Sequence, residues 1–187
     1  MKNIAVFASG NGSNFEAIAN AIKAGELRAN IALLVCDRPE ARVVERAKNH
    51  RVRVFSFSPK QFNTKADYEM RILEALYEAQ VEFILLAGYM RIIGETLLNP
   101  YDGRIINIHP SLLPAFPGKD AIAQAFDSGV SETGVTVHYV DAGVDTGPII
   151  AQCRVTVLPT DTLELLEKRI HQAEHTLYVQ TLKEILV

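Results

Sequence analysis

The chain has 187 residues, of which 48% are hydrophobic and 22% charged, the composition of an ordinary soluble globular protein with a full core. A formal net charge of −3 without a cluster of Lys or Arg argues against a protein that coats nucleic acid. No apolar run reaches membrane length or forms a signal-peptide core, so we expect a cytoplasmic protein without a membrane partner.

Strand-like and helix-like segments alternate from the N-terminus to His109. Apolar runs predict strands, in chain order, at Ile4–Ala8, Ile31–Cys36, Val52–Phe55, Phe83–Ala87 and Ile105–Ile108. The segments between them predict helices at Asn14–Ala24, Pro39–Asn49, Lys65–Glu78 and Ile93–Leu98. Continuous apolar strands separated by helices indicate a parallel sheet that is covered on both faces.

The pattern changes after His109. A helix over Asp120–Ser128 precedes two β-like segments, Thr133–Tyr139 and Pro148–Val157, and a last amphipathic helix starts at Thr162. A Gly- and Asp-rich loop joins the two β-like segments, which is typical of antiparallel strands. We therefore predict one α/β domain over residues 1–187, with three αβα layers and a mostly parallel, Rossmann-like sheet that ends in antiparallel strands.

The loop Ser9–Asn14 joins the first predicted strand to the first helix. Its two glycines permit a tight turn, and its free amides at a helix N-terminus favour an anion. Phe15 stands where a dinucleotide-binding loop would have a third glycine, which favours a single phosphate over a pyrophosphate. Two alternatives stay open: a purely structural turn, and a dehydrogenase in which Asp37 holds a ribose.

Asn107 and His109 interrupt an apolar strand at alternate positions, just before Pro110 ends it. Side chains two apart on a strand point to the same face, so these two project together where the strand becomes a loop. An amide donor beside an imidazole suits the stabilisation and protonation of a developing oxyanion. The competing interpretation is a turn asparagine and a core histidine.

Two further segments accompany this pair. The loop Asp141–Pro148 holds two aspartates and two glycines, and a carboxylate placed beside an imidazole would fix its tautomer. Leu86–Ile93 is an apolar strand end that opens into a hydrophobic wall with one Arg. Taken alone, the loop could be a common Asp-Gly turn and the apolar segment could be core.

Neither the histidines nor the cysteines of this chain predict a metal site. The segment His171–His175 matches an inverted zinc-peptidase motif, but a further carboxylate ligand well downstream is missing. Cys36 and Cys153 stand alone, which is typical of small core residues in a reducing compartment rather than of a disulfide.

Six blocks occur together in the order and spacing of one known family: Ser9–Asn14, Leu86–Ile93, Asn107–Pro114, Gly134–Tyr139, Asp145–Pro148 and Gln172–His175. From Ile4 to about Tyr178, the chain resembles the phosphoribosylglycinamide formyltransferases, folate-dependent enzymes of purine biosynthesis. The resemblance implies transfer of a formyl group from the cosubstrate 10-formyltetrahydrofolate to the amine of glycinamide ribonucleotide. It implies small-molecule partners only, no metal, and a monomer or homodimer.

The resemblance also implies a role for each group of site residues. The catalytic residues would be Asn107, His109 and Asp145. The ribonucleotide phosphate would be held by Gly12, Ser13 and Asn14, and its ribose and glycinamide would contact His171, Gln172 and Glu174. The folate would be framed by Lys65, Met90, Arg91, Ile92, Ile93 and Asn107, and by the backbone of Asp141, Ala142, Gly143, Val144 and Asp145. Lys65 stands where some members of the family have Arg.

Other functions remain as alternatives at this point. A formyltetrahydrofolate deformylase shares the Asn-x-His strand but normally has an N-terminal regulatory domain. A methionyl-tRNA formyltransferase would normally have a basic C-terminal domain, which is not seen here. A non-catalytic nucleotide-binding module would explain the first loop but would leave Asn107, His109 and Asp145 without a purpose.

Overall fold

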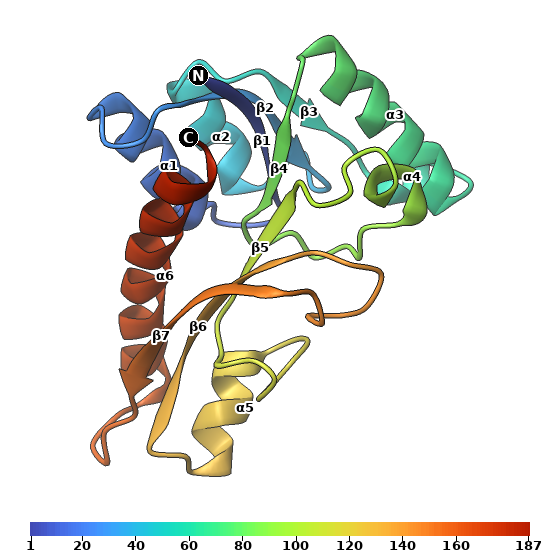
Figure 1. Ribbon diagram of the computed structural model, residues 1–187. Coiled ribbons are helices and arrows are strands. Elements are labelled where there is room, and N and C mark those ends of the chain that lie inside the picture. The colour runs from blue at the N-terminus through green and yellow to red at the C-terminus, as the bar shows by residue number, and fades with distance from the viewer.

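A computed structural model describes residues 1–187 and contains one mixed sheet flanked by helices (Figure 1). The sheet has seven strands in the order β3-β2-β1-β4-β5-β6-β7. They are β1 (Lys2–Ala8), β2 (Ala29–Cys36), β3 (Val54–Ser56), β4 (Phe83–Leu86), β5 (Ile105–His109), β6 (Glu132–Tyr139) and β7 (Ile149–Thr156). The first five strands are parallel, whereas β6 and β7 are antiparallel to their neighbours. The predicted fold class, including its antiparallel C-terminal end, is confirmed.

Helices cover both faces of this sheet, and each face has its own hydrophobic core. One core is formed with α1 (Ser13–Lys23), α2 (Arg42–Asn49) and α6 (Leu163–Ile185). The other is formed with α3 (Lys65–Glu78) and α4 (Glu95–Leu98). In Figure 1, α1 and α6 lie on the left of the sheet, α3 and α4 on the right, and α5 (Ala121–Ser128) at the bottom. A short 3-10 helix, η1 (Pro59–Gln61), precedes α3.

The apolar run of β1 explains its central place in the sheet. Ile4 and Val6 belong to the core under α1 and α6, whereas Ala5 and Phe7 belong to the core under α3. Successive side chains of a strand point to opposite faces, so a strand covered on both sides must be apolar throughout. This is why the continuous apolar pattern predicted the layered fold correctly.

Five predicted starts were wrong by two or three residues. The strands β1 and β2 each begin two residues before the expected Ile4 and Ile31, and three other elements begin later than expected. Pro39 does not open a helix: Ala41 N donates to Arg38 O in a turn, and α2 begins only at Arg42. The helix expected from Ile93 begins at Glu95. The strand expected from Val52 begins at Val54, because Val52 N donates to the carbonyl of Ala47 at the end of α2.

Two further features bear on the expectations from the sequence. Cys36 and Cys153 are both free thiols, as predicted. None of the helices combines the length and apolar character that crossing a membrane demands.

Candidate functional site

The topology brings the predicted site residues to one edge of the sheet. The strand order reverses between β1 and β4, and ligands of such sheets bind beyond the carboxyl ends of the strands at this point. The segments that follow β1, β4 and β5 therefore meet at the same edge. Ser9 N, after β1, donates to Gly88 O, after β4, over 3.1 Å, which ties two of these segments together.

Asp145 lies between two imidazoles. Its Oδ2 is 3.6 Å from Nδ1 of His109, and its Oδ1 is 3.7 Å from Nε2 of His138. The backbone amide of Gly118 donates to Oδ2 over 2.8 Å. Burial alone would raise the pKa of Asp145, but the contacts with His138, Gly118 and His109 outweigh it and lower that pKa below its usual value. The carboxylate is therefore ionised at neutral pH.

Asn107 joins the same cluster through the pairing of β5 with β6. In this register Asn107 stands directly opposite His138, and Nδ2 of Asn107 lies 3.4 Å from Nε2 of His138. Nδ1 of His138 donates to the carbonyl of Tyr139 over 2.8 Å, so Nε2 is the nitrogen that faces both Asn107 and Asp145. The structure thus brings Asn107, His109 and Asp145 together around a buried histidine.

His138 is a site residue that the sequence reasoning did not select. It was part of the block Gly134–Tyr139, but no local pattern sets it apart from other strand histidines. The signal lies in the strand pairing, because His138 faces Asn107 only once β6 is placed antiparallel beside β5. Its burial between an amide and a carboxylate makes it the link between Asn107 and Asp145.

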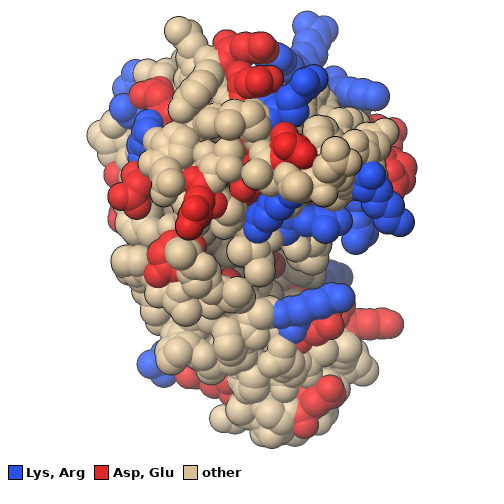
Figure 2. Space-filling view, turned by 90° about the vertical axis from the view of Figure 1, so that its right-hand side faces the viewer, with Lys and Arg blue, Asp and Glu red and all other residues tan.

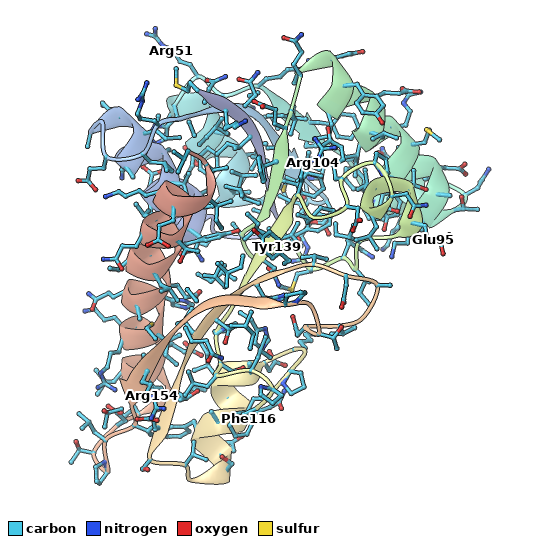
Figure 3. The ribbon with its side chains drawn as sticks, in the orientation of Figure 1. Arg51, Glu95, Arg104, Phe116, Tyr139 and Arg154 are labelled. Carbon is cyan, nitrogen blue, oxygen red and sulfur yellow. The ribbon has the colours of Figure 1, made fainter.

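A loop between β5 and α5 covers this cluster. Nε2 of His109 donates to the carbonyl of Phe116 over 2.9 Å, so this nitrogen carries a proton and Nδ1 faces Asp145. Phe116, labelled in Figure 3, has a φ of +49°, an uncommon backbone conformation for an aromatic residue. The loop thus accepts the hydrogen bond of His109 Nε2 through Phe116 O and donates one to Asp145 through the amide of Gly118.

The predicted phosphate loop has the geometry of an anion site. Gly12 has a φ of +77° and precedes α1, whose first helical hydrogen bond runs from Glu16 N to Gly12 O. The amides of Ser13 and Asn14 lie before that bond and have no acceptor within the helix. Such amides, at the positive end of a helix dipole, favour a phosphate.

The C-terminal helix brings its predicted residues to this loop. Asn14 Nδ2 donates to Oε2 of Glu174 over 3.4 Å, and His171 Nδ1 contacts Oε1 of Glu174 at 3.0 Å. The hydrogen bond to Glu174 raises the pKa of His171 above its usual value, although burial opposes it. Gln172 is exposed on the same turn of α6. The discarded zinc motif is therefore a hydrogen-bonded polar wall, and no three His, Cys, Asp or Glu side chains group as metal ligands.

The predicted folate residues divide into exposed and buried ones. Met90 and Ile92 are exposed, whereas Ile93 is buried in the core beside α3. Nε of Arg91 donates to Oδ2 of Asp37 over 3.0 Å, and the side chain of Asp37 is only 1% exposed, so it is not placed to hold a ribose. Lys65 opens α3 with its side chain near the backbone of residue 94.

The loop Asp141–Asp145 is mostly exposed and is held by its own side chains. Oδ1 of Asp141 accepts from the amide of Gly143 and the hydroxyl of Thr146, and these bonds lower the pKa of Asp141. Val144 is half exposed between them. The loop is therefore both exposed and held by hydrogen bonds of its own.

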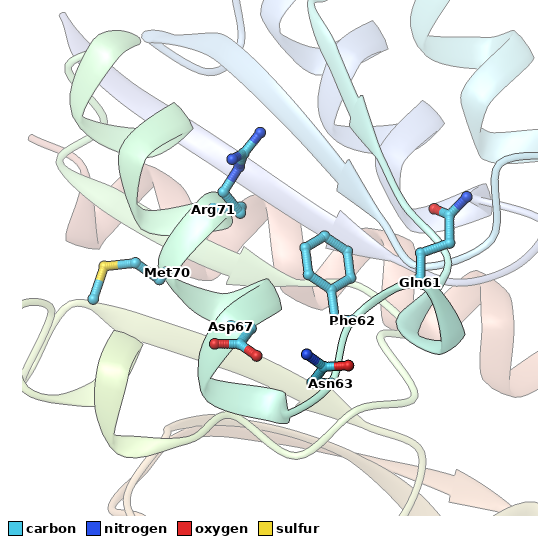
Figure 4. Close-up of a pocket in the computed structure, with 6 residues that line it drawn as sticks. All are labelled: Gln61, Phe62, Asn63, Asp67, Met70 and Arg71. Carbon is cyan, nitrogen blue, oxygen red and sulfur yellow. The ribbon is translucent and has the colours of Figure 1, made fainter.

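Two surface features lie near α3: a group of basic side chains and a hollow. Figure 2 shows a group of Lys and Arg side chains across the middle of the face that α3 and α4 occupy. A surface hollow of about 380 Å³ lies between η1 and α3 and is lined by Gln61, Phe62, Asn63, Asp67, Met70 and Arg71 (Figure 4). None of the predicted site residues lines this hollow, so the site is defined by side-chain chemistry rather than by that cavity.

The chain is similar to known proteins over its whole length. The profile described as formyl transferase matches residues 2–182. The phosphoribosylglycinamide formyltransferase of Bacillus subtilis (strain 168) is 57% identical over 186 residues, covering 100% of this chain and 95% of that protein. The structure of glycinamide ribonucleotide transformylase 1 from Geobacillus kaustophilus is 60% identical, covers 100% of both chains and gives a TM-score of 0.98. That of phosphoribosylglycinamide formyltransferase from Bacillus halodurans is 54% identical, covers 99% of this chain and 95% of the other, and gives a TM-score of 0.97.

Proposed function

Because the chain belongs to the formyl transferase family, and by full-length identity to its phosphoribosylglycinamide formyltransferases, we propose which residues carry out its reaction. The chain is an enzyme of purine biosynthesis that transfers a formyl group to the amine of 5'-phosphoribosylglycinamide. The proposed donor is 10-formyltetrahydrofolate, and the products are N-formylglycinamide ribonucleotide and tetrahydrofolate. The observation that supports the assignment is the cluster of Asn107, His109 and Asp145 at the carboxyl edge of the sheet.

The reaction needs an oxyanion stabiliser and a proton carrier, and no nucleophilic side chain. The substrate amine attacks the formyl carbon, so the formyl oxygen gains negative charge and the amine becomes an ammonium group. The Asn107 amide and the Nε2 proton of His109 donate to that oxygen. To do so, His109 exchanges its present acceptor, the Phe116 carbonyl, for the substrate oxygen.

Asp145 serves the proton transfer in this scheme. Its ionised carboxylate lies beside His109 and stabilises that imidazole when it gains charge. The same carboxylate accepts the proton that the ammonium group loses and passes it, directly or through water, to the departing folate nitrogen. His138 holds Asp145 and Asn107 in their relative positions.

Substrate binding is assigned to two sides of the cluster. The amides of Gly12, Ser13 and Asn14 hold the ribonucleotide phosphate, and His171, Gln172 and Glu174 contact its ribose and glycinamide. Lys65, Met90, Arg91, Ile92, Ile93 and Asn107 frame the folate together with the backbone of residues 141–145. Residues 1–187 act as one formyltransferase domain in this proposal, because a single sheet contains all seven strands. We further propose that the protein is cytoplasmic and is a monomer or homodimer.

The test follows folate absorbance when the purified protein meets 10-formyltetrahydrofolate, with and without glycinamide ribonucleotide. We expect conversion to tetrahydrofolate only when the ribonucleotide is present, with a formylated product detected by mass spectrometry. Formate released without the ribonucleotide would instead identify a deformylase. Binding of the ribonucleotide with no turnover at all would identify a nucleotide-binding module.

A further inference from the structure

The segment Gly88–Gly94, which carries four of the proposed folate residues, is fixed by three side chains from elsewhere in the chain. Ser9 Oγ accepts from Met90 N over 2.8 Å, Asp37 Oδ2 accepts from Arg91 Nε over 3.0 Å, and Glu69 Oε2 accepts from the amide at 94 over 2.8 Å. All three side chains are buried. Burying a polar group costs free energy unless the group forms a hydrogen bond. Each of these three buried side chains forms a hydrogen bond with the segment Gly88–Gly94.

The ion pair of Asp37 with Arg91 is asymmetric. The side chain of Asp37 is 1% exposed, whereas that of Arg91 is 44% exposed. Arg91 uses only its Nε toward Asp37, and its two Nη atoms bond no other group of the protein. A guanidinium group is rigid and planar, so the bond from Nε to Asp37 also fixes the direction in which both Nη atoms point.

Asp37 is a buried carboxyl residue that directly follows the last residue of β2. Oδ1 of Asp37 is buried and has no hydrogen-bond partner, so Asp37 adds desolvation cost without completing a network. The single bond from Asp37 to Nε is therefore best explained by the orientation that it gives to the guanidinium of Arg91.

We propose that Asp37 is a positioning residue that holds one edge of Arg91 so that its Nη edge binds a carboxylate of the glutamate tail of the folate donor. This inference rests on the proposed function, because a folate donor is what supplies the glutamate carboxylates. A guanidinium with two free parallel donors matches a carboxylate in a bidentate pair. The group of Lys and Arg side chains on the face that α3 and α4 occupy also favours an anionic tail (Figure 2).

The test measures the Kd of two ligands by isothermal titration calorimetry: tetrahydrofolate, and tetrahydropteroate, which lacks the glutamate. The proteins are the wild type, Asp37→Asn, Arg91→Ala and the double variant. Asp37→Asn should weaken tetrahydrofolate roughly tenfold, the scale of a bond to a charged group, and leave tetrahydropteroate within about twofold. In the double variant, Asp37→Asn should add less than about twofold to Arg91→Ala, since it acts through that residue.

Asp161→Asn is the matched control. Asp161 is also a buried carboxylate paired with a partly exposed arginine, Arg169, but it lies before α6 and away from the segment Gly88–Gly94. The Asp161→Asn substitution should change the Kd of neither tetrahydrofolate nor tetrahydropteroate. Equal weakening of both ligands by Asp37→Asn, or full additivity with Arg91→Ala, would overturn the inference, because either result indicates general damage to the loop.

Arg91→Lys keeps the inference testable if Asp37→Asn does not fold. A lysine ammonium can pair with Asp37 but has no second edge for the ligand. It should therefore weaken tetrahydrofolate as much as Arg91→Ala does, and wild-type affinity would refute the two-edge role. A wild type that binds neither ligand would defeat the proposed function itself, whereas wild-type behaviour of a folded Asp37→Asn protein defeats this inference alone.

Discussion

At the scale of single residues, Asp145 shares one carboxylate between His109 and His138. Both contacts are long, at 3.6 and 3.7 Å, while the Gly118 amide makes the short hydrogen bond. Losing one histidine therefore leaves the carboxylate with a partner. Because of this, replacing His109 should affect the chemistry without collapsing the buried cluster.

We expect His109→Ala to lower kcat by roughly 100-fold or more, because an acid that acts mainly in the transition state is lost. Steady-state kinetics on the purified variant gives this value. The Kd of glycinamide ribonucleotide should stay close to that of the wild type, since His109 is not among its proposed ligands. Turnover near the wild-type rate in a folded variant would remove His109 from the mechanism.

A second prediction at this scale concerns the pKa of His171. Glu174 raises it through a hydrogen bond, so Glu174→Gln should lower that pKa, because the imidazolium loses its anionic partner. Histidine NMR titration measures the change. Glu167→Gln is the control, because Glu167 acts on His171 only through space and as the smallest contribution, so the shift should be smaller. Equal shifts in the two variants would contradict the assigned bond.

At the scale of elements, apolar periodicity predicted the helices and strands but not their ends. The ends depend on contacts from elsewhere, as when the Gly94 amide is taken by Glu69 and α4 begins one residue later. The site residues likewise include some that a local pattern predicts and one that only a distant contact identifies. Asn107 and His109 could be paired from their spacing on one strand, whereas His138 joins them only through the register of two strands. The local sequence of a strand does not predict which residues of the neighbouring strand it will face.

The turn before α1 provides a test at this scale. A Cβ at Gly12 would clash with Cγ2 of Val43, and the φ of +77° disfavours any side chain. We expect Gly12→Ala to lower the free energy of unfolding by about 2–4 kcal/mol, from backbone strain plus overpacking. Urea denaturation measures it.

Gly10→Ala is the neighbouring control for that change. A Cβ at Gly10 would meet nothing within 4 Å, so the free energy of unfolding should change by less than about 0.5 kcal/mol. If both substitutions cost the same, the strain lies in the loop as a whole and not in the contact with Val43.

At the scale of the whole molecule, the C-terminal helix α6 packs against α1 near the N-terminus and against the sheet. The hydroxyl of Tyr178 lies 2.9 Å from Leu86 O and 3.2 Å from Ile106 O, which attaches the helix to the middle of the sheet. The same helix packs against α1 and carries the polar wall of Glu174. The site therefore depends on a long-range contact that sequence periodicity does not describe.

We expect Tyr178→Phe to lower the free energy of unfolding by about 1–3 kcal/mol, because buried carbonyls lose their donor. Urea denaturation measures this cost. Tyr77→Phe is the control, since Tyr77 is 58% exposed and its hydroxyl can bond to water, so the change should be within about 0.5 kcal/mol. A Tyr178→Phe protein as stable as the wild type would show that packing alone holds α6 on the sheet.

The bond between Asn14 and Glu174 spans 160 residues, and this has a consequence for protein synthesis. At about 5–20 residues per second, roughly ten to thirty seconds pass on the ribosome between the emergence of these two partners. During that time α1 lacks the helix that covers its apolar side. The proposed ribonucleotide site is therefore complete only after Glu174 has emerged, so we expect a polypeptide interrupted before that residue to have exposed core residues and no enzymatic function.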